Sequence, residues 1–249
     1  MNFNKSDLEK YLRYISKNFR VIPLRDYDAK PGIILRHDLD LDIRDAYEVY
    51  KLEKKHGLKS TFFVMVTSYF YNPLNQTNRQ MLKEMAVNGF EIGLHFDPTI
   101  YGSISRPELL KKAKYEAEIL ESITRQKVVS ISQHRPTLKN HNGTYLFFKD
   151  FRNTYDKNYF SHERYISDSR MRFLKDIYEF SKKGKGIPIQ VLLHPFHFTR
   201  EGETYEEKLF DFINETVEII DKDFRVISTY KQTMRNKKLT DRIQKFKDL

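Results

Sequence analysis

The chain has no cysteine among its 249 residues. This absence excludes disulfide bonds, thiolate metal sites and cysteine nucleophiles, and it suits a reducing compartment. The chain also lacks any apolar run approaching the ~20 residues that span a bilayer, and its first residues lack the uninterrupted apolar stretch of a signal peptide. We therefore expect a cytoplasmic protein with no transmembrane segment, in which any metal ion is held by histidine and carboxylate side chains.

No internal repeat, low-complexity tract or linker rich in proline, glycine and serine divides the sequence. A hydrophobic content of 39% provides a proper core, and the length fits one α/β barrel, so we expect a single domain over residues 1–249. The net charge is +10, but the basic residues are spread along the chain without a motif for specific nucleic-acid binding. We interpret this charge as solvated surface, with a basic rim that attracts anionic substrates as the alternative. The sequence contains no signal for an oligomeric state.

Apolar segments with strand character alternate with amphipathic helical patterns along the chain. Continuous apolar strands joined by helices predict a parallel sheet covered on both faces. The predicted strands are 32–37, 60–66, 90–96, 128–134, 165–168, 188–194 and 224–228, and the predicted helices are 6–18, 43–56, 77–88, 106–123, 171–182, 204–221 and 231–246. Seven such strands predict an α/β fold that closes, or nearly closes, into a βα barrel with a core of about 32–228 and flanking helices at both ends. Gly57 and Gly89 are expected to end helices, and 135–162 is predicted to be an irregular lid or pocket wall.

Polar residues follow five of the predicted strands at their downstream ends. These residues are Asp38, Asp40, His95, Asp97, His134, Arg135, Asp168, His194 and His197. The downstream ends of parallel strands converge on one mouth, where ligands bind. A single histidine at a strand end is more often a hydrogen-bonded structural residue, and Asp42 and Asp45 fit the first turn of a helix. Five strands that deliver titratable groups to one place favour a functional site instead.

Asp38 and Asp40 lie two residues apart on extended backbone, so both side chains can point into the same space. Two carboxylates tolerate this proximity when they share a cation or a proton, and we predict a divalent metal ion. Zn²⁺ commonly takes three ligands from histidine and carboxylate. One of the two aspartates, with His95 and His134, would form this set.

The remaining groups suit metal-assisted hydrolysis. The aspartate that is not a ligand is a candidate general base for a water molecule whose pKa the ion lowers. His194 arrives from a different strand and is a candidate general acid. Arg135 is a candidate to orient the base or a substrate oxygen.

Several segments occur in the order expected for one family. "GLKSTFFVMV" (57–66), "NGFEIGLH" (88–95), "QHRP" (133–136), "YISDSR" (165–170) and "VLLHP" (191–195) resemble motifs of the polysaccharide deacetylase superfamily, the NodB-homology domains of carbohydrate esterase family 4. The resemblance assigns the first metal histidine to His95, the arginine of the R-x-P motif to Arg135, and the catalytic acid to His194. Asp168 occupies the place of the acidic residue that supports this arginine.

The first motif departs from the family pattern of adjacent carboxylates, because "RHDLD" (36–40) separates its two aspartates by one residue. Alignment of His37 with the family's phenylalanine favours Asp38 as the base and leaves Asp40 as the metal ligand.

A second departure affects the metal site. The histidine expected four residues after the first metal histidine is replaced by Thr99. His134 is expected to complete the site from a neighbouring strand, and Asp97 is the alternative. Asp97 and His197 are assigned to substrate binding, with capping of the following turn as a further alternative for Asp97.

The resemblance implies a distorted (β/α)7 barrel that removes an N-acyl group from a sugar with the help of Zn²⁺. Its pattern is similar to a divergent branch found among surface-polysaccharide biosynthesis proteins. The implied substrate is a carbohydrate, anionic if it is nucleotide- or lipid-linked. Two alternatives remain, namely a metal hydrolase acting on a non-sugar C–N bond and a barrel scaffold that has lost catalysis.

Overall fold

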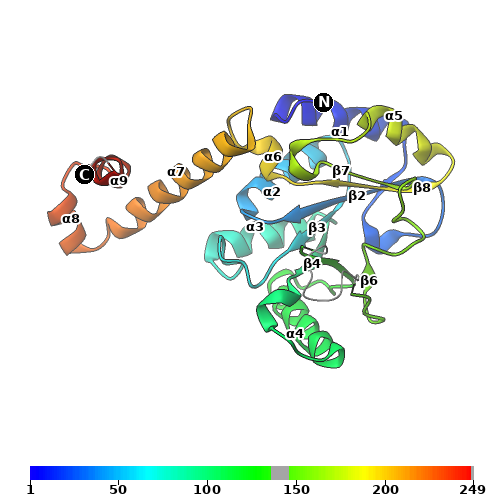
Figure 1. Cartoon of the computed structure of the whole chain (residues 1–249), viewed down its shortest axis with the longest axis horizontal. Helices are drawn as coiled ribbons and strands as arrows, with labels where there is room; N and C mark the ends of the chain where they lie inside the picture. Colours follow the sequence, from blue (N-terminus) through cyan, green and yellow to red (C-terminus); the bar gives the residue numbers. More distant parts are fainter. Residues whose placement is uncertain (136–145, 248–249) are drawn as a thin grey trace. The chain divides into compact units, whose positions relative to one another are not determined.

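The computed structural model describes residues 1–135 and 146–247. Two compact units divide the chain, Met1–Thr199 and Arg200–Leu249. The first unit contains all the strands of the described chain (Figure 1). The assignment of one domain to the whole chain stays a prediction.

The first unit is built on a parallel sheet. Its strands are β1 (Val21–Ile22), β2 (Gly32–Leu39), β3 (Thr61–Val64), β4 (Glu91–Phe96), β5 (Ser130–Gln133), β6 (Arg152–Asn153), β7 (Tyr165–Ser167) and β8 (Pro188–Leu193). Their order is β6-β5-β4-β3-β2-β8-β7, with β1 paired to the beginning of β2. Strands β2 to β8 thus follow one another in chain order around a ring, and β6 and β7 are not paired with each other in the described part of the chain. The predicted α/β fold of distorted (β/α)7 type is confirmed, as a curled sheet that is open between these two strands.

Helices cover the outside of this sheet. They are α1 (Lys5–Asn18), α2 (Ile43–Lys55), α3 (Gln76–Val87), α4 (Arg106–Thr124), α5 (Ile177–Ser181) and α6 (Phe196–Thr199), with short 3-10 helices at η1 (Leu24–Asp26), η2 (Pro98–Tyr101), η4 (Ser169–Met171) and η5 (Lys182–Lys185). Asp42 caps α2 by accepting a hydrogen bond from the Arg44 backbone N–H. Gly57 and Gly89 follow α2 and α3 with positive φ angles of 69° and 85°, as predicted for residues that end helices.

Alternation along β2 separates the core from the site. Ile33, Leu35 and Leu39 belong to the large cluster that packs between the sheet and the helices. Ile34 belongs instead to a small cluster at the lower end of the barrel interior, together with Phe63. Side chains of a strand alternate between its two faces. Arg36 and Asp38 therefore follow Ile34 on the same face, farther along the strand than this small apolar cluster. The strand therefore delivers charged groups to the open end of the barrel.

The second unit differs from the sequence prediction. It consists of α7 (Tyr205–Phe224), α8 (Ser228–Met234) and α9 (Leu239–Lys247). The predicted strand at 224–228 is wrong, because the first of these residues ends α7 and Val226 is 81% exposed. A short apolar run has no periodicity that separates strand from helix, and these residues have no sheet neighbour.

Four other elements differ from the sequence prediction. The helix predicted at 171–182 is reduced to η4, α5 and the beginning of η5, and the helix predicted at 231–246 is divided into α8 and α9. Strands β1 and β6 have two residues each, too few to produce an apolar pattern. The predicted lid lies partly outside the described residues, at 136–145. In the described ranges, no helix is both long enough and apolar enough to cross a membrane.

Candidate active site

A hollow of about 270 Å³ lies at the open end of the first unit. It is lined by Arg36, Asp38, Asp40, His95, Gln133, His134, Arg135, Tyr155, Phe160, Tyr165, Ser169, Leu192 and His194. Six of the nine predicted site residues are among them, contributed by the ends of β2, β4, β5 and β8. The parallel sheet brings these groups together because it places the downstream ends of its strands at one edge.

Asp40, His95 and His134 form a compact cluster in this hollow. Oδ1 of Asp40 lies 3.2 Å from Nε2 of His95 and 3.4 Å from Nδ1 of His134. The two imidazole nitrogens are 3.1 Å apart. All three ligand atoms lie within 4.8 Å of one another, which makes the cluster a candidate metal site.

The donor atoms of this cluster fit a divalent ion. Ligand atoms about 2.0 Å from an ion at tetrahedral angles are separated by about 3.3 Å, close to the three distances observed. Nδ1 of His95 donates to the Ser132 carbonyl oxygen at 3.1 Å, so the lone pair of Nε2 is directed at Asp40 and His134. A ring nitrogen fixed in this way is the usual arrangement of a metal-binding histidine. Two imidazoles and one carboxylate form a donor set that suits Zn²⁺.

The charges around this cluster favour a positive charge at its centre. Burial raises the pKa of Asp40, but the hydrogen bonds that the rings of His134 and His95 donate when they are protonated outweigh burial and hold this pKa well below its usual value. Burial lowers the pKa of His95, but the charges of Asp38 and Asp40 outweigh it and raise that pKa. A proton or a metal ion between these side chains provides this positive charge.

Asp38 is held from below by Arg36. Nη2 of Arg36 donates to Oδ2 of Asp38 at 3.1 Å, and the Ser132 hydroxyl donates to the same oxygen at 3.0 Å. Nη1 of Arg36 donates to the Gln190 side chain at 3.2 Å. Oδ1 of Asp38 is buried and has no hydrogen-bond partner among the described residues. One oxygen of Asp38 is therefore anchored and the other is left to accept a proton in the hollow.

Asp168 holds two histidines. Its carboxylate is fully buried and accepts hydrogen bonds from the His194 backbone N–H at 2.8 Å, from Nδ1 of His194 at 2.6 Å and from Nδ1 of His197 at 2.9 Å. Burial lowers the pKa of His194, but the Asp168 charge outweighs it and raises this pKa to about 9. Nε2 of His194 lies 3.9 Å from Oδ2 of Asp40, so the protonated ring faces the metal cluster.

Three of the predicted site residues are placed differently from the others. Arg135 lies at the rim of the hollow, exposed and with a positive φ of 48°, and no contact joins it to Asp168 in the described structure. His197 is buried against Asp168 and does not line the hollow. Asp97 caps η2, because its Oδ1 accepts hydrogen bonds from the backbone N–H and the hydroxyl of Thr99 at 2.9 and 2.6 Å.

Sequence reasoning missed the residues that support the site. Arg36 is 1% exposed, and its guanidinium lies 5.6 and 5.8 Å from the ring centroids of Tyr155 and Tyr165. A charged residue inside the apolar run "GIILRH" was the available signal, because a buried charge requires a partner. His37 is also buried, with Nε2 2.7 Å from Glu53. No comparable signal marks Ser132 or the two tyrosines.

Comparison with known families supports the motif resemblance. The family model described as "Polysaccharide deacetylase" matches residues 42–147. This range contains His95 and the segment "QHR" (133–135), which includes His134 of the candidate metal site. It contains neither Asp38 nor His194. No curated protein matches the chain.

Solved structures of several carbohydrate deacetylases and related proteins are similar to this chain. A mutant of a CE4 family pseudoenzyme of Bacillus anthracis, with restored enzymatic activity, is 16% identical with a TM-score of 0.43, and the match covers 75% of this chain and 64% of that one. The chitin deacetylase of Colletotrichum lindemuthianum is 14% identical with a TM-score of 0.49, covering 78% and 86%. The peptidoglycan deacetylase PdaC of Bacillus subtilis is 15% identical with a TM-score of 0.45, covering 78% and 98%.

The chain thus spans less than two thirds of the first of these proteins and most of the other two. Its ordered motifs and the family-model match agree with each other. Over residues 42–147 this chain is similar to the polysaccharide deacetylases.

Proposed function

We propose that this protein is a metal-dependent hydrolase that removes an N-acyl group, acetyl in the first instance, from a sugar or glycan intermediate of surface-polysaccharide biosynthesis. The observation that carries the proposal is the convergence of Asp40, His95 and His134 on one point at the open end of the barrel. A base and an acid stand beside this point, on separate strands. Their arrangement suits hydrolysis of an amide, which needs both groups.

Asp40, His95 and His134 would hold the ion, and Zn²⁺ is the ion that we propose. When bound, the ion supplies a Lewis acid for the amide carbonyl and lowers the pKa of water. We assign to His134 the role of the second metal histidine, whose usual position holds Thr99, because β5 lies beside β4 and ends at the same rim. With Thr99 in place of a histidine, three protein ligands are therefore still available for the ion.

Asp38 is the general base in this proposal. Its Oδ2 is fixed by Arg36 and Ser132, which leaves the buried Oδ1 to take a proton from the attacking water. The anchoring contacts also keep the carboxylate in one rotamer, and general base catalysis depends on such positioning.

His194 is the general acid. Asp168 accepts the proton of Nδ1 and stabilises the imidazolium, so that Nε2 holds a proton to give to the departing amine. Asp168 thus acts through His194, and the contact of Asp168 with His197 keeps the carboxylate in place. Arg135, at the rim, is left to contact a substrate oxygen.

The metal site can be tested by metal analysis of purified protein. We expect about one divalent ion per chain, lost in His95→Ala and in His134→Ala and retained in the control His56→Ala, whose ring contacts Glu9 instead. Zinc should raise the melting temperature of the wild type and of the control but not of the other two variants. Retention of the ion in both site variants would show that the cluster is not the metal site.

Catalysis can be tested by the release of acetate from N-acetylglucosamine oligomers. We expect Asp38→Asn to keep the ion and to lose on the order of 10²–10⁴ in rate, the usual contribution of a general base. The ion content of this variant separates loss of the base from loss of the metal. Absence of released acetate from metal-loaded wild type, across neutral and phosphorylated N-acetyl sugars, would favour a non-catalytic barrel.

A further inference from the structure

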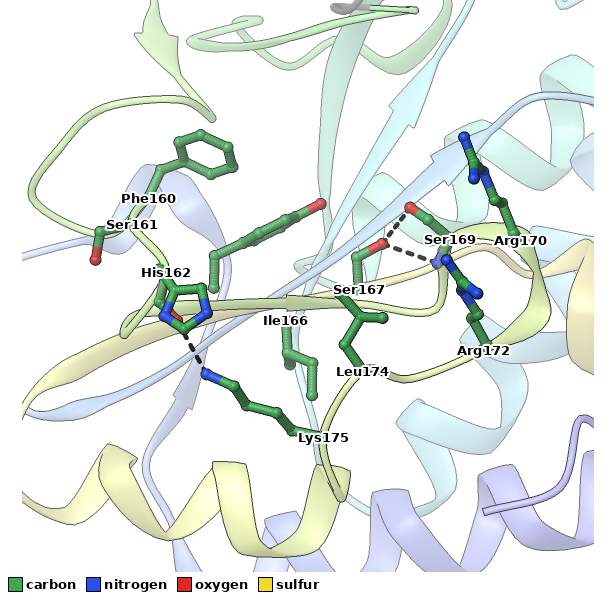
Figure 2. A pocket seen from close by; sticks show the side chains of 11 residues that line it. Phe160, Ser161, His162, Ile166, Ser167, Ser169, Arg170, Arg172, Leu174 and Lys175 are labelled. Carbon is green, nitrogen blue, oxygen red and sulfur yellow. Dashed lines mark hydrogen bonds between the residues drawn. The ribbon is translucent and has the colours of Figure 1, made fainter.

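A second hollow, of about 430 Å³, borders the candidate active site. Figure 2 shows its lining, which consists of Phe160, Ser161, His162, Tyr165, Ile166, Ser167, Ser169, Arg170, Arg172, Leu174 and Lys175. All of these residues come from the segment 160–175, which contains β7 and η4. Phe160, Tyr165 and Ser169 line both hollows, so the two are neighbours across these three side chains.

The charge of this second hollow is entirely positive. Arg170, Arg172 and Lys175 line it, and no aspartate or glutamate does. Neither guanidinium forms an ion pair in the part of the chain that the structure describes, whereas Lys175 contacts only the His162 carbonyl oxygen at 3.4 Å. Figure 2 shows Arg170 and Arg172 at one end of the hollow beside Ser169, with Lys175 and His162 toward the other end. Unpaired guanidiniums beside a hydroxyl form a site for an oxyanion.

The backbone holds the two arginines in a sharp turn. Arg170 and Met171 have positive φ angles of 60° and 49°, a conformation that side chains other than glycine adopt rarely. Two consecutive residues of this kind occur where the surrounding structure enforces them. Ser169 stands at the start of this turn, next to Asp168, the residue that holds His194. The turn therefore links the cationic end of the second hollow to the acid of the first.

The floor of the second hollow is apolar. Ile166 is buried beneath it, and Leu174 lies in its middle with 82% of its surface exposed. An exposed leucine between cationic side chains suits a ligand that joins an apolar or aromatic group to a negative charge. A free inorganic anion would use the arginines alone.

We infer that the second hollow binds the phosphate of a sugar substrate, so that the acylated sugar occupies the first hollow while its phosphate contacts Arg170 and Arg172. The inference rests on the proposed function and names the substrate class, a glycosyl phosphate or pyrophosphate. The apolar floor accommodates the group on the other side of the phosphate, which is a nucleoside in a nucleotide sugar or an isoprenoid in a lipid-linked sugar. Guanidiniums stay protonated at all relevant pH values, so the site remains cationic while the active site titrates.

The experiment measures binding by calorimetry with the full chain. The probes are inorganic pyrophosphate, uridine diphosphate and a short isoprenyl pyrophosphate, with neutral N,N′-diacetylchitobiose as the uncharged comparison. The test variant is Arg170→Gln with Arg172→Gln, and the control is Arg79→Gln with Lys83→Gln, which removes the same charge from exposed positions of α3.

We expect the test variant to bind the two carrier probes roughly a hundredfold more weakly than wild type, about tenfold for each lost charge-assisted contact. The control should lose no more than about threefold, the share of general charge. The tighter of the two carrier probes identifies the carrier. Unchanged binding in the test variant, equal losses in the test and control variants, or no binding of any phosphate probe at millimolar concentration would each overturn the inference.

A kinetic readout separates this inference from the proposed function. For a wild type that deacetylates, the ratio of kcat/KM for a phosphorylated over a neutral N-acetyl sugar should fall at least roughly tenfold in the test variant. A wild type that binds the phosphate probes through the two arginines but releases no acetate would refute the proposed reaction and leave the phosphate site standing. If the wild type deacetylates neutral sugars and the ratio of kcat/KM is the same in the test variant, the phosphate site would be refuted and the proposed reaction would stand.

Discussion

Glu116 provides a test of how burial affects an acidic side chain in the first unit. Its side chain is 1% exposed on the inner face of α4. Oε1 accepts a hydrogen bond from the Tyr101 hydroxyl at 2.6 Å, while Oε2 is buried without a hydrogen-bond partner among the described residues. Burial raises the pKa of Glu116 to about 7; the Tyr101 hydrogen bond lowers it in part, and the charge of Asp97 adds to the rise.

The magnitude follows from the two pKa values. The ordinary value is 4.5 and the folded value is about 7, a difference of about 2.5 that corresponds to about 3 kcal/mol. Because the folded protein binds this proton more tightly than the unfolded chain, the stabilisation is fully present below pH 4.5 and is lost as the pH rises through 7. Glu116→Gln cannot ionise and escapes this loss. We expect the variant to be about 3 kcal/mol more stable relative to wild type at pH 8.5 than at pH 4.5.

Urea unfolding followed by circular dichroism, at pH 4.5, 6, 7 and 8.5, measures this difference. Comparison across pH removes any constant packing effect of the glutamine. Tyr101→Phe serves as the second variant: loss of its hydrogen bond should raise the pKa of Glu116 further and shift the loss of stability to higher pH. A difference between Glu116→Gln and wild type that stays flat from pH 4.5 to 8.5 would refute the reasoning.

Three further substitutions test ion pairing, packing and helix capping in the first unit. Arg36→Met leaves Asp38 buried and unpaired, so we expect a loss of about 3–5 kcal/mol in urea unfolding; Arg36→Lys should recover part of it, and equal losses would contradict the pairing. Gly93→Ala would place a Cβ 2.5 Å from Phe63 and should cost about 1–3 kcal/mol, relieved when Phe63→Leu is added; lack of relief would point to another clash. Asp42→Ala removes the cap of α2 and should lower the free energy of unfolding by about 1 kcal/mol, with a change near zero as the contrary outcome in thermal denaturation.

The architecture of the first unit could be predicted because its signals are local. Strand β2 reads as an apolar run, and β3, β4 and β8 do so as well, with amphipathic helices between them. Parallel strands then force their downstream ends to one edge, so the meeting of Asp40, His95 and His134 followed from positions in the chain alone. The same reasoning gave a wrong strand at 224–228 in the second unit, because a few apolar residues fit a helix as well as a strand.

The sequence by itself therefore determined the fold class and which groups gather at the mouth of the barrel. Only the tertiary structure decided their partners: Arg36 rather than Arg135 beside Asp38, and His194 with His197 around Asp168. The strand order follows from the alternation of elements, which every segment carries in its own residues. The hydrogen-bond partner of a site residue depends instead on the register between strands that are distant in the chain and on the rotamer that packing allows. A local sequence pattern determines neither.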